Sequence, residues 1–110
     1  MQKAPITTHI LDLHRGQPAA GVTVALYCAG EPIATAETDS DGRIQQWDKD
    51  FELVPQQWTL VFQLQPWFTQ RDAECFFPLA TLDFTISDCA RHYHIPLLLN
   101  QYGYTTYRGS

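Results

Sequence analysis

The sequence has little positive charge. Seven Lys and Arg residues stand against 12 Asp and Glu residues, so the formal net charge at pH 7 is −5. An acidic protein gains nothing electrostatically from DNA, RNA or an anionic membrane surface. No apolar stretch approaches the ~20 residues that a membrane-spanning helix needs. We therefore expect neither nucleic acid nor a membrane as a partner.

Cysteine is also scarce. The three cysteines, Cys28, Cys75 and Cys89, are an odd number without C-x-x-C spacing, which does not favour a disulfide framework or a zinc ribbon. We expect small, buried or partly buried residues with free thiols. Free thiols are typical of a reducing compartment, and residues 1–8 contain no apolar signal core. We therefore expect a cytoplasmic protein.

The length and composition predict one globular domain over residues 1–110. Hydrophobic residues make up 45% of the chain and charged residues 17%, as in ordinary globular proteins. A chain of 110 residues has a common size for a single domain and can bury a core without help from disulfides or metal. Neither a linker nor a repeat divides the sequence.

Alternation of apolar and polar residues with a period of two is the dominant pattern. It is clear in 22–28, 58–65 and 81–87, and it is typical of strands that bury one face. Turn signals such as Arg15-Gly16-Gln17-Pro18 separate the runs. The pattern therefore predicts an all-β sandwich or barrel, with strands near 5–14, 20–28, 32–38, 43–47, 57–65, 80–87, 91–99 and 102–107.

One short helix is predicted from Thr69 to Phe77. The Thr69 hydroxyl can accept a hydrogen bond from a free amide at the helix start. Asp72 and Glu74 suit the positive end of the helix dipole, and Pro78 cannot continue a helix.

Leu97-Leu98-Leu99 departs from the alternation, because both faces of the strand end are apolar there. One face belongs to the core, and a partner subunit would cover the other. An aromatic strand at 102–107 follows almost directly. Together these two strands predict an oligomer interface, most simply one with two-fold symmetry.

Three chemically active residues lie on predicted strands. His9 and His94 occupy positions where a strand favours apolar residues, and Arg43 follows the Asp41-Gly42 turn. A histidine can move a proton near neutral pH, and an arginine can hold a carbonyl oxygen or an oxyanion. With a carboxyl terminus at Ser110, they suit hydrolysis without a covalent nucleophile. Spacing alone does not establish that they meet, and each histidine could be a structural residue.

A metal site is an alternative at His92 and His94, which point the same way on a strand and could share a zinc ion. His9 or His14 would have to supply a third ligand, and the cationic Arg43 would oppose a divalent ion. We therefore expect no metal. The segment from Asp39 to Gly42 lacks the later ligands of a calcium loop and is predicted to be a turn.

Six segments carry motifs that can be compared with a known family: 8–12, 15–19, 41–43, 76–78, 92–99 and 102–110, the last with the terminal motif Tyr107-Arg108-Gly109-Ser110. Together they resemble the transthyretin-like family, and within it the 5-hydroxyisourate hydrolases. The resemblance implies a two-sheet sandwich of about eight strands with one short helix, assembled as a homotetramer from two dimers. Active sites would lie at the dimer–dimer interface.

The resemblance also implies an activity, namely hydrolysis of 5-hydroxyisourate to 2-oxo-4-hydroxy-4-carboxy-5-ureidoimidazoline in urate degradation, without a cofactor. His9 would activate the water and His94 would orient it or relay the proton, although the sequence does not decide which histidine is the base. The catalytic residues of the family match His9, Arg43 and His94. The substrate-binding set would comprise these three with Tyr107, Arg108 and Ser110.

Two other classes of function stay open. Transthyretin carries thyroid hormone on this fold but lacks the His/Arg/His set and the terminal motif that the resemblance identifies here. A β-sandwich interaction module without chemistry is the other alternative. A monomer in solution would favour it, since the implied site needs two subunits.

Overall fold

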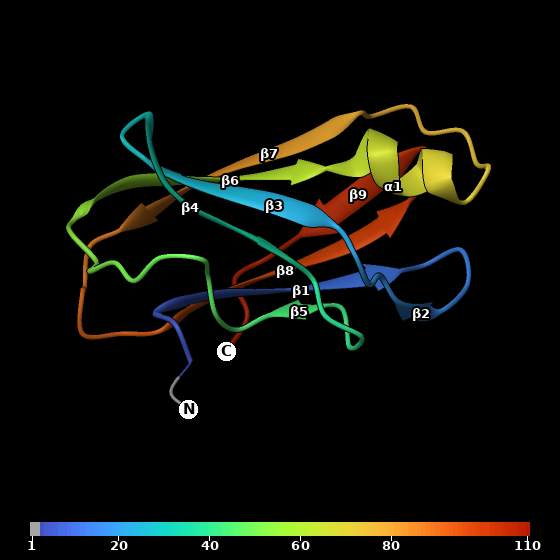
Figure 1. The fold of residues 1–110 in the computed structure, drawn as a ribbon. Coiled ribbons are helices and arrows are strands. Elements are labelled where there is room, and N and C mark those ends of the chain that lie inside the picture. Colours follow the sequence, from blue (N-terminus) through green and yellow to red (C-terminus); the bar gives the residue numbers. More distant parts are fainter. Residues whose placement is uncertain (1–2) are drawn as a thin grey trace.

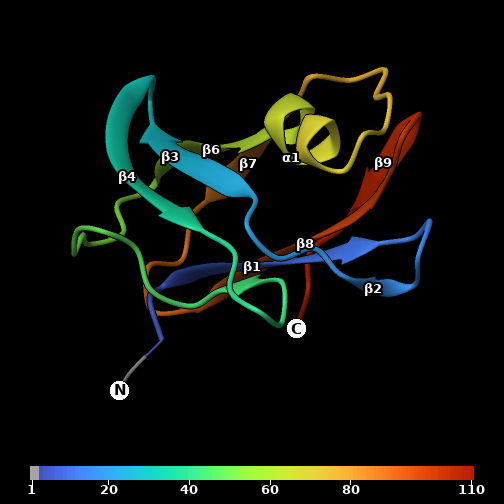
Figure 2. The same cartoon turned by 45° about the vertical axis from the view of Figure 1, so that its right-hand side comes forward.

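Two β-sheets pack face to face, with one short helix at one end. The structure, a computed structural model, describes residues 3–110. Figure 1 shows the sheets as two layers, and Figure 2 shows them after a 45° turn. Sheet A has the order β2-β1-β8-β9, with β5 also paired to β1, and sheet B has the order β4-β3-β6-β7. The strands are β1 (Ile6–Asp12), β2 (Gln17–Pro18), β3 (Thr23–Cys28), β4 (Glu31–Glu37), β5 (Arg43–Ile44), β6 (Gln56–Gln63), β7 (Leu79–Ile86), β8 (Tyr93–Asn100) and β9 (Gly103–Thr106).

The central pair of sheet A is parallel, and all other strand pairs in the two sheets are antiparallel within the described chain. Strand β8 lies along one edge of β1 over the full length of β1. Along the opposite edge, β5 pairs with Thr8 and His9, while β2 pairs with Leu11 and Asp12. The middle of β1 therefore lies between β8 and β5, two strands that are distant from it in the sequence.

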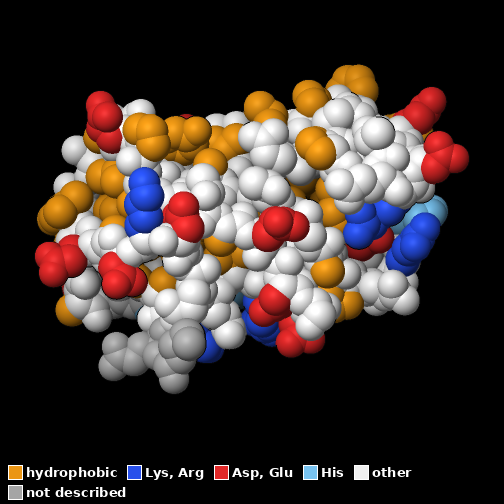
Figure 3. Space-filling view, viewed as in Figure 1, with side chains coloured by type: hydrophobic (Ala, Val, Ile, Leu, Met, Phe, Trp, Pro, Cys, Tyr) orange, Lys and Arg blue, Asp and Glu red, His pale blue; other side chains and the backbone are white. Residues whose placement is uncertain are grey.

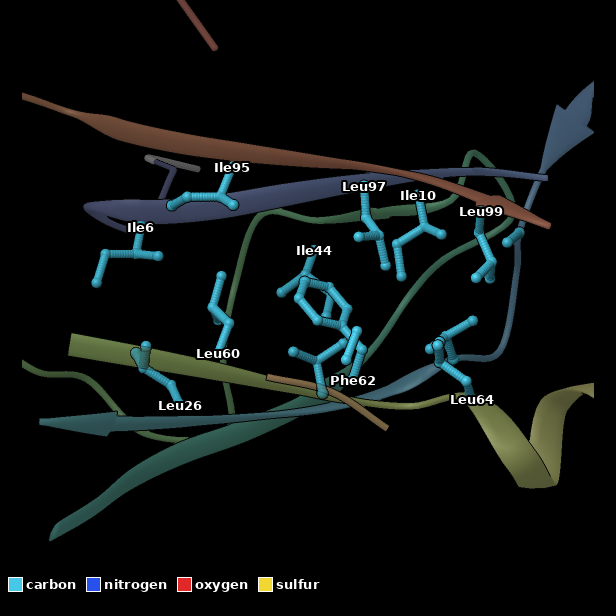
Figure 4. Packing of buried hydrophobic residues seen from close by; sticks show 14 of the residues in the cluster. Ile6, Ile10, Leu26, Ile44, Leu60, Phe62, Leu64, Ile95, Leu97 and Leu99 are labelled. Carbon is cyan, nitrogen blue, oxygen red and sulfur yellow. The ribbon is translucent and has the colours of Figure 1, made fainter. Parts of the chain in front are cut away.

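The core fills the space between the sheets, where alternate residues of each strand point inward. Figure 4 shows these side chains from both sheets facing each other. Trp58 and Phe62 of β6 are the largest fully buried side chains. Residues of β1 and β8 that face the core include Ile6, Ile10 and Leu97. Because Ile6, Ile10 and Leu97 point inward and successive side chains of a strand alternate, Thr7, His9 and His94 project from the other face of sheet A.

The predicted all-β sandwich is confirmed, and the strand positions agree within a few residues. Two strands of only two residues, β2 and β5, complete sheet A. The first was not predicted, because a two-residue pairing such as Gln17–Pro18 leaves no alternation to detect. The predicted strand at 43–47 ends after Ile44.

The predicted position of the helix is wrong. Helix α1 spans Leu64–Gln70 and follows β6 directly. Its buried residues Leu64, Trp67 and Phe68 have the i, i+3, i+4 spacing of an amphipathic helix, and packing of this stripe outweighs the cap signals. Thr69 is not the N-cap. Its hydroxyl accepts a hydrogen bond from Gln65 Nε2 at 3.1 Å near the helix end.

The cysteine prediction is partly wrong. Cys28 and Cys75 are half-buried with free thiols, whereas Cys89 is exposed in the loop between β7 and β8.

The residues Leu97 and Leu99 face the core, and Leu98 is half-buried on the outer face, as the two-sided pattern predicted. In the part of the chain that the structure describes, no helix is long and apolar enough to cross a membrane.

Candidate active site

The outer face of sheet A brings the predicted catalytic residues together. In the strand register, His94 of β8 lies beside Thr7 of β1, and Arg43 of β5 lies opposite His9. In both ribbon views the C-terminus lies on the side of sheet A that faces away from sheet B (Figures 1 and 2). Strand pairing, which spacing in the sequence could not reveal, thus gathers residues from four distant segments.

A tight turn presents Arg43. The Asp39 carboxylate accepts hydrogen bonds from the backbone N–H groups of Asp41 and Arg43, at 2.9 and 3.0 Å. Gly42 has a φ of 74°, and an added Cβ would lie 2.5 Å from the Ile10 carbonyl oxygen. Only glycine fits this close approach between the turn and β1. The predicted turn is confirmed, and it fixes the position of β5 against β1.

The chain end is attached to β8 directly at His94. The Gly109 N–H donates to the His94 carbonyl oxygen at 2.8 Å, and the two residues form a β-bridge. An added Cβ on Gly109 would lie 2.6 Å from His94 Cδ2. The absence of a side chain at Gly109 therefore lets the chain end pack against the edge of the His94 ring, with Ser110 beyond it.

These residues line two adjoining hollows of about 260 and 450 Å³ that share Arg43, His94 and Ser110. We refer to the two hollows together as the outer pocket. Volumes of this size suit a small-molecule ligand. Acidic and basic side chains lie side by side at the lower edge of the molecule, near β5 (Figure 3). The smaller hollow is also lined by Lys3, Thr7, Thr8, Gln45 and His92, and the larger by His9, Leu11, Pro96, Leu98, Tyr107 and Gly109.

The environment of His94 disfavours its charged form. Burial lowers the pKa of His94 below its ordinary value, and the neighbouring charge of Arg43 lowers it further, with smaller contributions from His92, His9 and Lys3. His94 is therefore a neutral imidazole at pH 7, with one nitrogen able to accept a proton.

The His94 ring is held by a hydroxyl that sequence reasoning did not select. Thr7 Oγ1 lies 2.7 Å from His94 Nδ1 and 2.9 Å from His92 Nε2. Within residues 3–110, His94 Nε2 has no hydrogen-bond partner, and it is not a buried atom. The sequence does place Thr7 on the same strand face as His9. Because threonine is common in strands, this position alone did not mark Thr7 as a site residue.

Two residues that the sequence singled out do not line the outer pocket. The Arg108 guanidinium stacks over the Tyr93 ring, 4.6 Å from its centroid, and lines a third hollow between residues of β7 and two residues of the outer pocket, His94 and Tyr107. His14 lies in another hollow, beside Arg71 of the helix end. Among residues 3–110, no three His, Cys, Asp or Glu side chains are grouped so that they could hold a metal ion.

Comparison with known proteins gives matches over almost the whole chain. Residues 6–109 match the model of the HIUase/Transthyretin family. The 5-hydroxyisourate hydrolase of Salmonella dublin is 39% identical over 109 residues, which cover 96% of this chain and 80% of that relative.

Solved structures of both branches share the fold. The 5-hydroxyisourate hydrolase of Klebsiella pneumoniae superposes with a TM-score of 0.86 at 39% identity, covering 96% of this chain and 98% of that one. Sea bream transthyretin in complex with thyroxine superposes with a TM-score of 0.88 at 27% identity, covering 96% and 95%. The two TM-scores are nearly equal, so the fold alone does not distinguish the branches, whereas the sequence identity is higher to the hydrolase.

Proposed function

This chain belongs to the HIUase/Transthyretin family, and on that premise we propose that it is an enzyme that hydrolyses 5-hydroxyisourate in the outer pocket. The observation that carries the proposal is the meeting of His9, Arg43 and His94 on one face of sheet A, next to Ser110. Hydrolases of this substrate are among the relatives that match nearly the full chain. The product proposed is 2-oxo-4-hydroxy-4-carboxy-5-ureidoimidazoline, in urate breakdown.

The reaction needs a base for water, a group that stabilises a negative oxygen, and a proton for the leaving nitrogen. Sequence reasoning favoured His9 as the base without deciding between the histidines. The geometry supports His94 instead, because its ring is held at Nδ1 while Nε2 is open, and its lowered pKa keeps it neutral. His94 Nε2 therefore removes a proton from the attacking water.

The other residues complete the chemistry. The guanidinium of Arg43 holds the carbonyl oxygen under attack and stabilises the negative charge that develops on it. His9, opposite Arg43 in the strand register, relays a proton to the ring nitrogen that leaves. Ser110 and Tyr107 line the pocket and position the purine-derived ring. Contact of Arg108 with substrate stays a prediction, since its guanidinium lies over Tyr93.

We also propose that the protein works as a homotetramer in the cytoplasm. Leu11 and Leu98 are half-buried on the outer face and line the larger hollow, so a second subunit against this face would cover them and close the pocket. Three free cysteines suit a reducing compartment.

A rapid-mixing ultraviolet assay tests the activity. Urate oxidase generates 5-hydroxyisourate, the protein is added at several concentrations, and substrate decay is compared with the spontaneous rate. We expect acceleration in proportion to the protein concentration, and a matched concentration of an unrelated β-sandwich protein gives the baseline. A folded tetramer that leaves the spontaneous rate unchanged would reject the proposal.

Ligand carriage is the second candidate, favoured by the close superposition on transthyretin bound to thyroxine. The identity of only 27% to that protein and the His/Arg/His set in the pocket argue against it. Quenching of tryptophan fluorescence by thyroxine measures binding directly. Micromolar or tighter binding by a protein without hydrolase activity would favour carriage.

A further inference from the structure

A single hydroxyl lies between two imidazole rings at the edge of the outer pocket. Thr7 Oγ1 is 2.9 Å from His92 Nε2 and 2.7 Å from His94 Nδ1. The Thr7 side chain is only 3% exposed, so water does not compete freely for these contacts. His92, in contrast, is exposed.

The number of protons restricts how these contacts can form. A threonine hydroxyl carries one proton and can donate one hydrogen bond, while its oxygen can accept two. A neutral histidine has one nitrogen that donates and one that accepts. If Thr7 donates to His92, then the contact with His94 requires a proton on His94 Nδ1. If Thr7 donates to His94 instead, the neutral His94 ring carries its proton on Nε2.

We infer that Thr7 is a positioning residue that holds His94 with its proton on Nδ1, because the Thr7 hydroxyl donates to His92 Nε2 and accepts from His94. This arrangement leaves a lone pair on His94 Nε2, facing the outer pocket. The catalytic consequence rests on the proposed function, whereas the proton position is a property of the substrate-free protein.

The charges around His94 favour this arrangement over the reverse one. A lone pair on Nε2 is stabilised by nearby positive charge, whereas an N–H dipole directed into the same region is not. The positive charges that act on His94 are those of Arg43 on β5 and of Lys3, and the rings of His9 on β1 and of His92 before β8 lie near them. The Ser110 carboxylate at the chain end lines the same hollow and carries the opposite charge.

The protonation of His92 Nε2 determines whether the Thr7 hydroxyl can donate its hydrogen bond to His92. When His92 is neutral, its Nε2 can accept the Thr7 proton. When His92 carries a proton on Nε2, that nitrogen donates to Thr7 Oγ1 and cannot accept the Thr7 proton, which leaves the hydroxyl free to donate to His94 Nδ1. A neutral His94 ring that accepts at Nδ1 carries its proton on Nε2 and cannot act as a base there.

Nitrogen NMR of the substrate-free protein tests the inference. Protein labelled with ¹⁵N-histidine is examined at pH 8, where the lowered pKa of His94 keeps its ring neutral. The two ring nitrogens have different chemical shifts with and without a proton. We expect His94 to be protonated on Nδ1. Thr7→Val should move the proton to Nε2, since Nδ1–H would then face a methyl group, and Thr7→Ser should restore the wild-type pattern.

The matched control is Thr8→Val. Thr8 is the next residue of β1 and is also buried, but its hydroxyl donates to the Ile95 carbonyl oxygen at 2.6 Å and touches neither histidine. We expect this variant to keep the wild-type His94 pattern. A wild-type His94 protonated on Nε2, or a Thr7→Val protein whose pattern is unchanged, would overturn the inference. Should Thr7→Val not fold, Thr7→Ala removes the hydroxyl instead, and an unchanged His94 pattern there would also overturn the inference.

Kinetics then separates positioning from mere stability. Thr7→Val should lower kcat on the order of 10²-fold while KM changes little, because the base is lost and the binding groups remain. Thr7→Ser should recover most of kcat. A wild-type protein that shows the expected NMR pattern but no hydrolysis would reject the proposed function and leave the assignment of the proton standing.

Discussion

Substituting Gly109 by Ala is the most informative single change, because this residue packs its backbone against the His94 ring. The added Cβ would lie 2.6 Å from His94 Cδ2 and 3.2 Å from the His94 carbonyl oxygen. Two carbon atoms normally approach no closer than about 3.5 Å. The ring or the chain end must therefore move by about 1 Å. Movement of the chain end would weaken the 2.8 Å hydrogen bond from the Gly109 N–H to the His94 carbonyl oxygen.

The expected cost follows from that displacement. A shift of about 1 Å in a catalytic group can reduce the rate on the order of 10²-fold, which corresponds to about 2.7 kcal/mol of transition-state stabilisation. The loss should appear in kcat/KM for 5-hydroxyisourate, measured by rapid mixing. The thermal unfolding midpoint should change little, because Gly109 lies outside the core between the sheets.

Gly103→Ala provides the matched control. Gly103 lies only six positions earlier in the sequence, but its added Cβ would meet nothing closer than Asn100 Oδ1 at 4.0 Å, so kcat/KM should stay near the wild-type value. Wild-type activity in a folded Gly109→Ala protein would refute the claim that this contact positions His94.

Three further predictions concern the same pocket. His9→Ala should lower kcat by ~10²–10⁴, the range for loss of a proton-transfer group; near-normal turnover would remove His9 from the mechanism. Arg43→Gln removes a positive charge that lowers the pKa of His94, so the pKa of His94 should rise. The base acts when it is neutral, so activity is present above this pKa and is lost as the pH falls through it. The acid limb of the kcat/KM profile should therefore move to higher pH. An unmoved acid limb would contradict the assignment of His94 as the base. A peptide tag appended after Ser110 should impair kcat/KM, since Ser110 lines both hollows, and proteolytic removal of the tag should restore it; full activity of the tagged protein would refute a role for the chain end.

Alternation in the sequence was sufficient to predict the longer strands. In β6, Trp58, Leu60 and Phe62 are all buried as their spacing predicts. The helix position was not predictable in the same way, because Thr69, Asp72 and Pro78 are local signals, whereas the burial of Trp67 depends on packing. The positive φ of 54° at Asp72 also shows that the chain has already left the helix there.

The site was predictable in its residue types but not in its geometry. The strand pairing of His9 with Arg43 and of Thr7 with His94 joins segments more than thirty and eighty residues apart, and no local pattern encodes such a register. For the same reason Thr7 was missed. Its importance comes from two histidines near the other end of the chain, His94 on β8 and His92 just before that strand.

The most direct test of the account compares wild-type protein with His94→Ala in the decay of freshly made 5-hydroxyisourate, after unfolding curves confirm that both are folded. The account predicts that the wild-type protein accelerates decay in proportion to its concentration, and that His94→Ala loses ~10²–10⁴ of kcat, the range for loss of a general base. A folded His94→Ala protein with wild-type turnover would contradict it.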